Sequence, residues 1–438
     1  MKEITGYILQ FLLGNVSPDL KSAIAYTDDE NVFDQYKLVI FPSPFFQKEN
    51  YGKVEILPQL PLAEWEGSPL LFGRPEMEKR GDTIILYADV IASSYFLISR
   101  YEEYARPNCR DAHGRFPGKE SLPCRAGFLH RPVVDEYGKS LRKLLRNIGL
   151  DVPEETPAGI RKIYLTHDVD KLAHYRNLRS TAGTVLRCFG NFKEACFALK
   201  TYVGGVKNDP WFTFPLLFKL NNTLRRKTGD NRCETIAFIK EGGGKRQEDK
   251  PLLDIMSKDF KRFFDLCRKN GVKFGLHPSY EAGGQPELVK KEKELLEKAI
   301  NSEIRYSRHH FLRSREPRDM YALINAGITD DFTMGYADVA GFRLGTSRPV
   351  RWINPETQQL TSLVLHPLTV MEISLSDSRY MALNEEDAFA YAIKLIDETK
   401  KHNGDLTLLW HNTSVEKGKG YQRNLYERVV ISLSPALS

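Results

Sequence analysis

Cysteine is scarce in this chain of 438 residues, and its spacing argues against two kinds of cross-linked protein. The six cysteines are widely separated and form no Cys-x-x-Cys pair, which is unlike a zinc knuckle or a disulfide framework. No apolar run approaches the length of about 20 residues that a membrane-spanning helix needs. Internal repeats and low-complexity tracts are also lacking. These absences predict a globular protein with reduced thiols and no transmembrane segment.

A strong excess of one charge is missing as well. The chain has 63 Lys and Arg against 57 Asp and Glu, and the net charge of +6 is spread along the sequence. We therefore expect no nucleic-acid partner. The first 20 residues, MKEITGYILQFLLGNVSPDL, carry an acid at position 3, a polar break at Gln10 and no small-residue cleavage pattern. This pattern is unlike an export signal, so we expect a cytoplasmic protein.

Apolar residues are plentiful, at 41% of the sequence, and a chain of this length commonly forms two domains. The stretch DVPEETPAG at 151–159 combines two prolines, three acids and a glycine between a helical pattern and an apolar strand. It predicts the domain boundary. We expect a smaller α/β domain at 1–158, with no evident active-site motif, and a second domain at 159–438.

In the second domain, helices alternate with short apolar strands that lead to a polar residue. Gly271 can end a helix that is followed by VKFGL and His277, and Gly404 can end another that is followed by LTLLW and His411. The first of these helices has an apolar stripe with helical spacing, formed by Phe260, Phe263, Phe264 and Cys267. Such alternation predicts a parallel sheet or barrel, whose catalytic groups gather at the C-terminal ends of the strands. A mostly helical insertion at about 175–232 is expected to lie near this site.

Two carboxylates end the first strand of this domain, in the stretch IYLTHDVD. Asp168 and Asp170 are two positions apart, so a strand places both on one face. Two ionised carboxylates repel each other unless a cation or hydrogen-bond donors offset the repulsion. The pair can instead be a solvated turn, or the DxD motif with which a glycosyltransferase binds a sugar nucleotide through a divalent ion.

Histidines at two further strand ends favour a hydrolytic metal site over the sugar-nucleotide site, because imidazole suits zinc and similar metals. Each of them, His277 and His411, can alternatively be a hydrogen-bonded core residue. The cluster Arg308, His309 and His310 is either a solvated loop or part of the site. In the site, Arg308 can keep a carboxylate ionised through charge-assisted hydrogen bonds, and His310 can face the metal.

The order of these motifs resembles a known family, the polysaccharide deacetylases of carbohydrate esterase family 4, also called the NodB homology domain. The resemblance covers roughly 160–438 and rests on LTHDVD, GLHPSY, SRHHFLR, DFTMGYADVAGFRLGTS and LLWHN, in that order. It is closest to a bacterial branch whose N-terminal domain has no assigned function, and SSYFLISRYEEYARP resembles that domain.

The resemblance implies a distorted (β/α) barrel that holds a divalent metal, usually zinc, and removes acetyl groups from sugars. The substrate would be an acetylated sugar or glycan. Carried over by motif, the roles are a catalytic base at Asp168, a metal-ligating acid at Asp170, a metal histidine at His277, a base-orienting arginine at Arg308 and a proton donor at His411.

The second motif departs from the family pattern. The family usually has a second histidine one helical turn after the first, but this chain has Glu281 four residues after His277. The third metal ligand is therefore open: His310 is our first choice, with His309 and Glu281 as alternatives. The departure also makes a non-catalytic, sugar-binding relic of the deacetylase fold an alternative to an enzyme.

Overall fold

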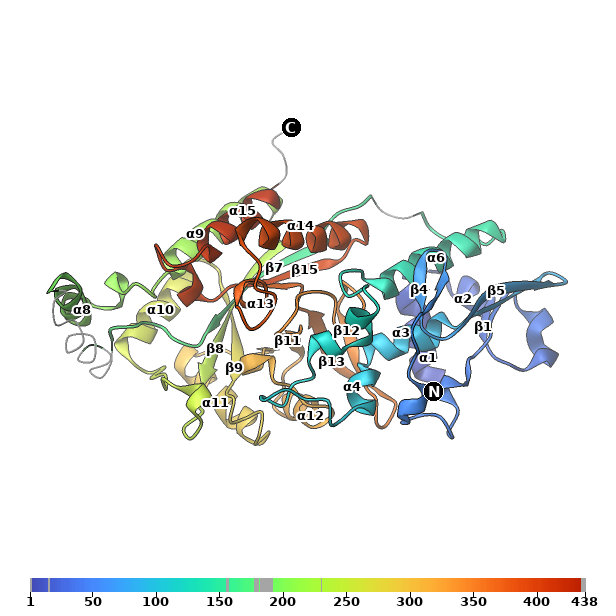
Figure 1. Cartoon of the computed structure of the whole chain (residues 1–438), viewed down its shortest axis with the longest axis horizontal. Coiled ribbons are helices and arrows are strands. Elements are labelled where there is room, and N and C mark those ends of the chain that lie inside the picture. The colour runs from blue at the N-terminus through green and yellow to red at the C-terminus, as the bar shows by residue number, and fades with distance from the viewer. Residues whose placement is uncertain are drawn as a thin grey trace. The chain divides into compact units, whose positions relative to one another are not determined.

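The computed structural model describes residues 2–14, 16–154, 157–176, 181, 192–229 and 231–434, and it has a mixed α/β fold (Figure 1). The chain forms two compact units. Unit 1 comprises Met1–Arg161, Met334–Thr369 and Lys394–Leu406. Unit 2 comprises Lys162–Thr333, Val370–Ile393 and Thr407–Ser438. The boundary near residue 158 that the sequence suggests remains a prediction.

Unit 1 contains a four-stranded sheet with the order β1-β2-β6-β5. Its strands are β1 (Ile24–Tyr26), β2 (Leu38–Ile40), β5 (Gly73–Arg80) and β6 (Thr83–Ala88). β1, β2 and β6 are parallel, whereas β5 runs antiparallel to β6. Val39 of β2 and Ile85 of β6 are fully buried in one core cluster, which explains why both strands are apolar.

Helices and short strands complete unit 1. The helices are α1 (Lys2–Leu13), α2 (Pro18–Ser22), α3 (Val90–Ile98), α4 (Tyr101–Ala105), α5 (Leu122–Arg125) and α6 (Val133–Asn147). Antiparallel pairs are formed by β3 (Ala63–Trp65) with β4 (Ser68–Leu70), and by β12 (Val350–Asn354) with β13 (Gln359–Pro367). Buried ion pairs connect the segments of this unit: Arg343 donates to both oxygens of Glu103, at 2.9 and 2.6 Å.

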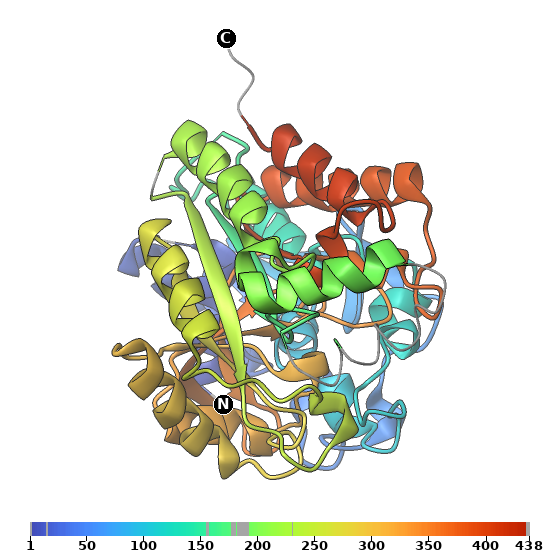
Figure 2. The same ribbon diagram turned by 90° about the vertical axis from the view of Figure 1, so that its left-hand side faces the viewer.

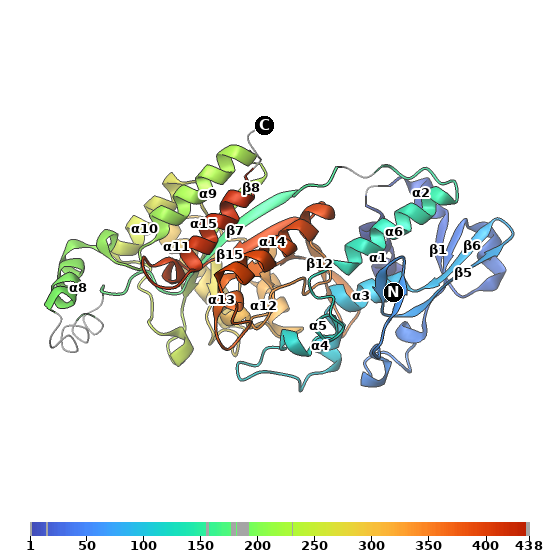
Figure 3. The same cartoon turned by 45° about the horizontal axis from the view of Figure 1, so that its top comes forward.

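Unit 2 is built around a curved sheet in which neighbouring strands follow the order β11-β10-β9-β8-β7-β15-β14. The strands are β7 (Lys162–Val169), β8 (Cys233–Glu241), β9 (Lys273–Pro278), β10 (Tyr306–Ser307), β11 (Asp330–Met334), β14 (Val370–Met371) and β15 (Asp405–Leu409). Each of the strands from β7 to β11 pairs in parallel with the next, and β14 is parallel to β15. Figures 1 and 3 show β7 beside β15. The expected α/β class with a distorted barrel and a smaller N-terminal sheet is confirmed.

Helices connect and follow these strands. They are α8 (Phe192–Gly204), α9 (Phe214–Thr228), α10 (Lys258–Lys269), α11 (Leu288–Ile300), α12 (Arg318–Asn325), α13 (Glu372–Ser376), α14 (Glu385–Lys401) and α15 (Gln422–Ser432). All four apolar residues of the predicted stripe are buried in α10, whose N-terminus is capped by Ser257. In Figure 2, α8, α10 and β8, coloured from green to yellow, lie on the side nearest the viewer.

The predicted helical insertion at about 175–232 is described only in part. Residues 177–180, 182–191 and 230 of this stretch lie outside the described residues. The described remainder contains α8 and α9, and α9 packs against β8. Across the described ranges of the whole chain, no helix has both the length and the apolar character needed to cross a bilayer.

Phe263 provides a test of the unit 2 core. It is fully buried in α10, and its ring centroid lies 4.5 Å from that of Phe214 in α9. We predict that Phe263→Ala lowers the free energy of unfolding by about 3–5 kcal/mol, because it removes packed surface and leaves a cavity. Urea unfolding followed by circular dichroism measures this. Lys261→Ala, at an exposed position of the same helix, should change stability little. Equal effects of the two substitutions would contradict this packing.

Candidate functional site

The base candidate Asp168 lies in β7, where a buried arginine holds its carboxylate. Nη1 of Arg308 donates to Asp168 Oδ1 at 3.0 Å and to Thr166 Oγ1 at 2.7 Å. Arg308 is fully buried, and its guanidinium stacks 4.5 Å from the ring centroid of Phe238. Burial lowers the pKa of Arg308, and Asp168 opposes this effect. The usual pKa of arginine is so high that the guanidinium stays charged. The ion pair orients the carboxylate of Asp168.

The two imidazoles nearest the acids are held in one orientation by their Nδ1 atoms. His277, at the end of β9, has Nδ1 2.5 Å from the carbonyl oxygen of Arg308. His310 has Nδ1 3.1 Å from Asp249 Oδ1. Because a carbonyl oxygen and a carboxylate oxygen can only accept, both Nδ1 atoms must carry the proton. In the neutral imidazoles, each Nε2 is then left with a lone pair.

Both Nε2 atoms converge on one carboxylate oxygen. Oδ1 of Asp170 lies 3.2 Å from Nε2 of His277 and 3.4 Å from Nε2 of His310. This oxygen is buried and accepts no hydrogen bond of good geometry among the described residues. Burial raises the pKa of Asp170, but the charge of His310 and contacts with both imidazoles outweigh burial and hold it well below its usual value. The ionised oxygen and two imidazole nitrogens form a group that can hold a metal ion.

The proton-donor candidate His411 follows β15 and lies on the other side of Asp170. Its Nε2 is 3.7 Å from Asp170 Oδ2, and its Nδ1 is 2.8 Å from Oε1 of Glu372. The same Oε1 also accepts from the His411 backbone N–H and from the Ser414 hydroxyl. Burial lowers the pKa of His411, but the charge of Glu372 and its hydrogen bond outweigh burial and raise the pKa to about 10. At neutral pH the metal-free protein therefore has a proton on His411 Nε2.

A buried polar chain connects the two strands that carry Asp168 and His411. His167 in β7 donates from Nδ1 to the carbonyl oxygen of Trp410, at 2.8 Å, and its Nε2 is 2.9 Å from Nδ2 of Asn221. Burial lowers the pKa of His167 to about 4, so the ring is neutral at pH 7. The neutral ring can donate and accept at once, which fixes the ends of β7 and β15 side by side.

Of the two alternative ligands, Glu281 has other partners, and the ring nitrogens of His309 have no hydrogen-bond partner among the described residues. Oε2 of Glu281 accepts from the Lys245 backbone N–H at 3.2 Å, and Oε1 accepts from the Gln285 amide at 3.4 Å. His309 is buried, and its backbone N–H donates to the Thr333 hydroxyl. Neither belongs to the group that surrounds Asp170 Oδ1. Thus the structure brings together Asp168, Asp170, His277, Arg308, His310 and His411, but not Glu281 or His309.

Sequence reasoning missed two carboxylates in this site, Glu372 and Asp249. Glu372 is fully buried in the stretch TVMEISL, where a lone acid among apolar residues was a usable signal. Asp249 is also fully buried, but it stands in the charged stretch RQEDK, where nothing in the sequence distinguishes it from a solvated acid.

Unit 1 contains two other features that could bind an ion or a ligand. Glu136, Glu398 and His402 are close enough to share an ion, but both oxygens of Glu136 already accept hydrogen bonds from Arg131, and one also from Ser68. This carboxylate is thus neutralised by an arginine.

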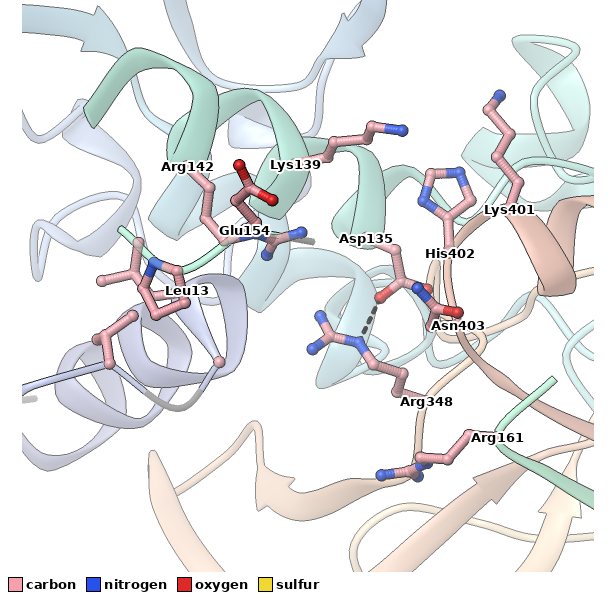
Figure 4. Close-up of a pocket in the computed structure, with 13 residues that line it drawn as sticks. Leu13, Asp135, Lys139, Arg142, Glu154, Arg161, Arg348, Lys401, His402 and Asn403 are labelled. Atoms are coloured by element: carbon pink, nitrogen blue, oxygen red, sulfur yellow. Dashed lines mark hydrogen bonds and ion pairs between the residues drawn. The ribbon is translucent and has the colours of Figure 1, made fainter. Parts of the chain in front are cut away.

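Figure 4 shows the second feature, a cavity of about 400 Å³ with a mostly basic lining. Arg161 pairs with Asp405, Arg348 pairs with Asp135, and Arg142 donates to the carbonyl oxygen of Leu12. These arginines hold segments of unit 1 together, so the site around Asp170 is the better candidate for chemistry.

A family model matches the N-terminal part of this chain. A family of unknown function, DUF7033, matches residues 3–149. This agrees with the expected N-terminal domain of unassigned function. A comparison with curated proteins found no match.

Among solved structures, one described as a polysaccharide deacetylase from Mycobacterium smegmatis is similar at 13% identity and a TM-score of 0.39, over 65% of this chain and 90% of that one. An allantoinase is similar at 10% identity and a TM-score of 0.37, over 65% and 91%. A carbohydrate esterase family 4 pseudoenzyme from Bacillus anthracis has 11% identity and a TM-score of 0.31, over 65% and 67%. The chain therefore has structural similarity to family 4 deacetylases and to an allantoinase.

The Glu372–His411 pair makes a prediction that needs no substrate. In metal-free wild type, the imidazole of His411 should keep its second proton up to about pH 10. Glu372→Gln removes the stabilising negative charge, so the pKa of His411 should fall by about one to three units. Nitrogen-15 NMR of histidine-labelled protein measures both values. Ser414→Ala removes a neutral partner of the same oxygen and should shift the pKa much less; an unchanged pKa in Glu372→Gln would contradict the pairing.

Proposed function

We propose that this protein is a metal-dependent hydrolase that removes an acetyl group from a sugar or glycan, with zinc as the metal. The observation that supports it most is the convergence of two Nδ1-anchored imidazoles on the buried Oδ1 of Asp170. Burial lowers the pKa of His310, but the charge of Asp170 outweighs burial and raises it, so in the metal-free protein a proton on Nε2 of His310 would face the carboxylate. A metal ion would take the place of that proton. The donor set of one carboxylate and two imidazoles suits zinc.

Asp170, His277 and His310 would hold the metal. A bound zinc ion polarises an acyl carbonyl and lowers the pKa of water. The remaining groups of the site lie on both sides of these ligands: Asp168 Oδ2 is 3.7 Å from His277 Nε2, and His411 Nε2 is 3.7 Å from Asp170 Oδ2. An acid–base pair that flanks a metal site in this way suits hydrolysis of an acetyl group.

Asp168 is the proposed general base. Its Oδ1 is held by Arg308, so Oδ2 is the oxygen that accepts a proton from the attacking water. The ion pair with Arg308 also orients the carboxylate. A backbone N–H near Phe311 would stabilise the developing oxyanion. Phe311 and Leu312 have φ values of +62° and +53°, a strained conformation that is common at functional sites.

His411 is the proposed general acid. It would give its Nε2 proton to the leaving nitrogen or oxygen of the sugar as the carbon–heteroatom bond breaks. Glu372 stabilises the protonated imidazole and keeps Nδ1 occupied, so only Nε2 can deliver the proton. Water supplies one proton to Asp168 and His411 returns one to the leaving group, so the cycle balances when the two exchange a proton through solvent.

The choice of an acetylated sugar as substrate rests on the sequence motifs. LTHDVD, GLHPSY, SRHHFLR and LLWHN contribute the residues that meet in this site, in the order that resembles family 4 deacetylases. The imidazole-rich donor set also makes a DxD glycosyltransferase a poorer fit, because such a site binds its ion through carboxylates and phosphates.

Metal binding separates the three candidates for the third ligand. Wild type should bind about one zinc ion per chain, and both His277→Ala and His310→Ala should lower the affinity sharply, because each removes a nitrogen that faces Asp170. Glu281→Ala and His309→Ala should bind zinc as wild type does. Elemental analysis and competition with a chelator measure content and affinity. Zinc loss in Glu281→Ala alone would overturn the His310 assignment, and an empty wild type would overturn the proposed function.

Turnover separates an enzyme from a sugar-binding relic. Asp168→Asn and His411→Ala should keep metal content near that of wild type, because neither side chain is a proposed ligand. Acetate release should fall by about 10²–10⁴-fold in each, the usual contribution of general acid–base catalysis. Acetylated amino sugars, nucleotide-linked sugars and oligosaccharides form the substrate panel. If wild type and both variants release acetate equally slowly while sugar binding is intact, the protein is a sugar-binding relic and not an enzyme.

A further inference from the structure

Asp249 is a buried acid in a loop whose neighbouring side chains reach solvent. The loop follows β8 and contains a short 3-10 helix, Gln247–Asp249. Asp249 has no exposed surface, whereas Glu248 is partly exposed and Lys250 is exposed. Burying an ionised carboxylate is costly unless donors compensate for the lost water. The buried carboxylate of Asp249 therefore needs hydrogen-bond donors within the protein.

Three donors surround this carboxylate, and they come from two different motifs. Oδ1 is 3.1 Å from Nδ1 of His310 and 2.8 Å from the backbone nitrogen of Tyr280. Oδ2 accepts from the backbone N–H of Glu281 at 3.0 Å. Asp249 thus accepts hydrogen bonds from both His310 and the segment after β9.

We propose that Asp249 is the positioning residue that makes His310 the third metal ligand. This inference rests on the proposed function, because it concerns the same metal site. By accepting the Nδ1 proton, Asp249 leaves the Nε2 lone pair of His310 directed at Asp170 Oδ1, 3.4 Å away. A carboxylate partner on the far nitrogen also makes an imidazole a better electron donor to a metal.

The same carboxylate accounts for the departure from the family pattern in the second motif. Its bonds to Tyr280 and Glu281 anchor the backbone at the position where the family usually has its second histidine. The Glu281 side chain instead meets Lys245 and Gln285. One buried acid therefore supports a ligand from the third motif and fixes the segment that contributes no ligand.

The two metal histidines differ in what holds them, which makes the role of Asp249 testable by substitution. His277 donates to a backbone carbonyl, which no side-chain change removes. His310 depends on a side chain. In Asp249→Asn, one of the two oxygens becomes an NH2 group, which would face either Nδ1–H of His310 or the N–H of Glu281. In either orientation, the new NH2 group would face another hydrogen-bond donor.

The experiment measures zinc affinity of the full chain by chelator competition in wild type, Asp249→Asn, the matched control Glu248→Gln, His310→Ala and the double variant. We expect Asp249→Asn to weaken zinc binding by about 10–100-fold, the usual effect of removing a partner behind a ligating histidine. Glu248→Gln should match wild type. In the His310→Ala background, Asp249→Asn should cause little further loss, because its effect passes through His310.

Failure of the positioning role can be told apart from failure of the proposed function. If wild type binds no zinc, the proposed function fails. If wild type binds zinc but Asp249→Asn matches it, or if the Asp249 and His310 effects simply add, the positioning role alone is overturned. The metal-free unfolding midpoint of Asp249→Asn reports general damage to the fold, and a purely structural role would lower it without changing affinity.

A second measurement needs no variant and so remains decisive if Asp249→Asn does not fold. Nitrogen-15 NMR of zinc-loaded wild type should show His310 with its proton on Nδ1 and its metal-bonded nitrogen at Nε2. A proton on Nε2 of His310 in the loaded wild type would overturn the inference.

Discussion

The site depends on hydrogen bonds that occupy Nδ1 of three histidines. The carbonyl oxygen of Arg308 holds His277, Asp249 holds His310 and Glu372 holds His411. Every one of these acceptors leaves Nε2 facing the pair of acids at the end of β7. An imidazole can present either nitrogen, so its orientation must come from the partner on the other side. The acceptors also differ in their effect on charge: burial lowers the pKa of His411, but the charge of Glu372 outweighs burial and raises it.

Buried charges in the site are compensated within it. Arg308 is fully buried beside Asp168, and Glu372 is fully buried beside His411. Removing one member of such a pair leaves a buried charge without a partner, which is much more costly than losing a surface ion pair. The compensation explains how three aspartates, one glutamate and three histidines can lie so close together.

Unit 1 shows the same use of buried ion pairs for a structural purpose. Glu103 is held by Arg343 and Asp135 by Arg348, although the members of each pair are more than 200 positions apart in the sequence. The backbone N–H of Ser347 also donates to Asp135 at 2.8 Å. The compact unit therefore includes most of the fourth deacetylase-like motif, DFTMGYADVAGFRLGTS, and the order of motifs alone did not indicate this.

Local patterns in the sequence determined the strands that end in Asp168 and His277, the apolar stripe of α10 and the gathering of polar residues at one edge of a parallel sheet. They succeeded because strand and helix periodicity, and the direction of parallel strands, depend on near neighbours. Tertiary structure alone decided that Glu372 and Asp249 stand behind His411 and His310, and that Glu281 points elsewhere. A carboxylate within a charged loop looks the same in sequence whether water or a buried imidazole meets it. Its role is fixed only when folding removes the water and leaves one donor within reach.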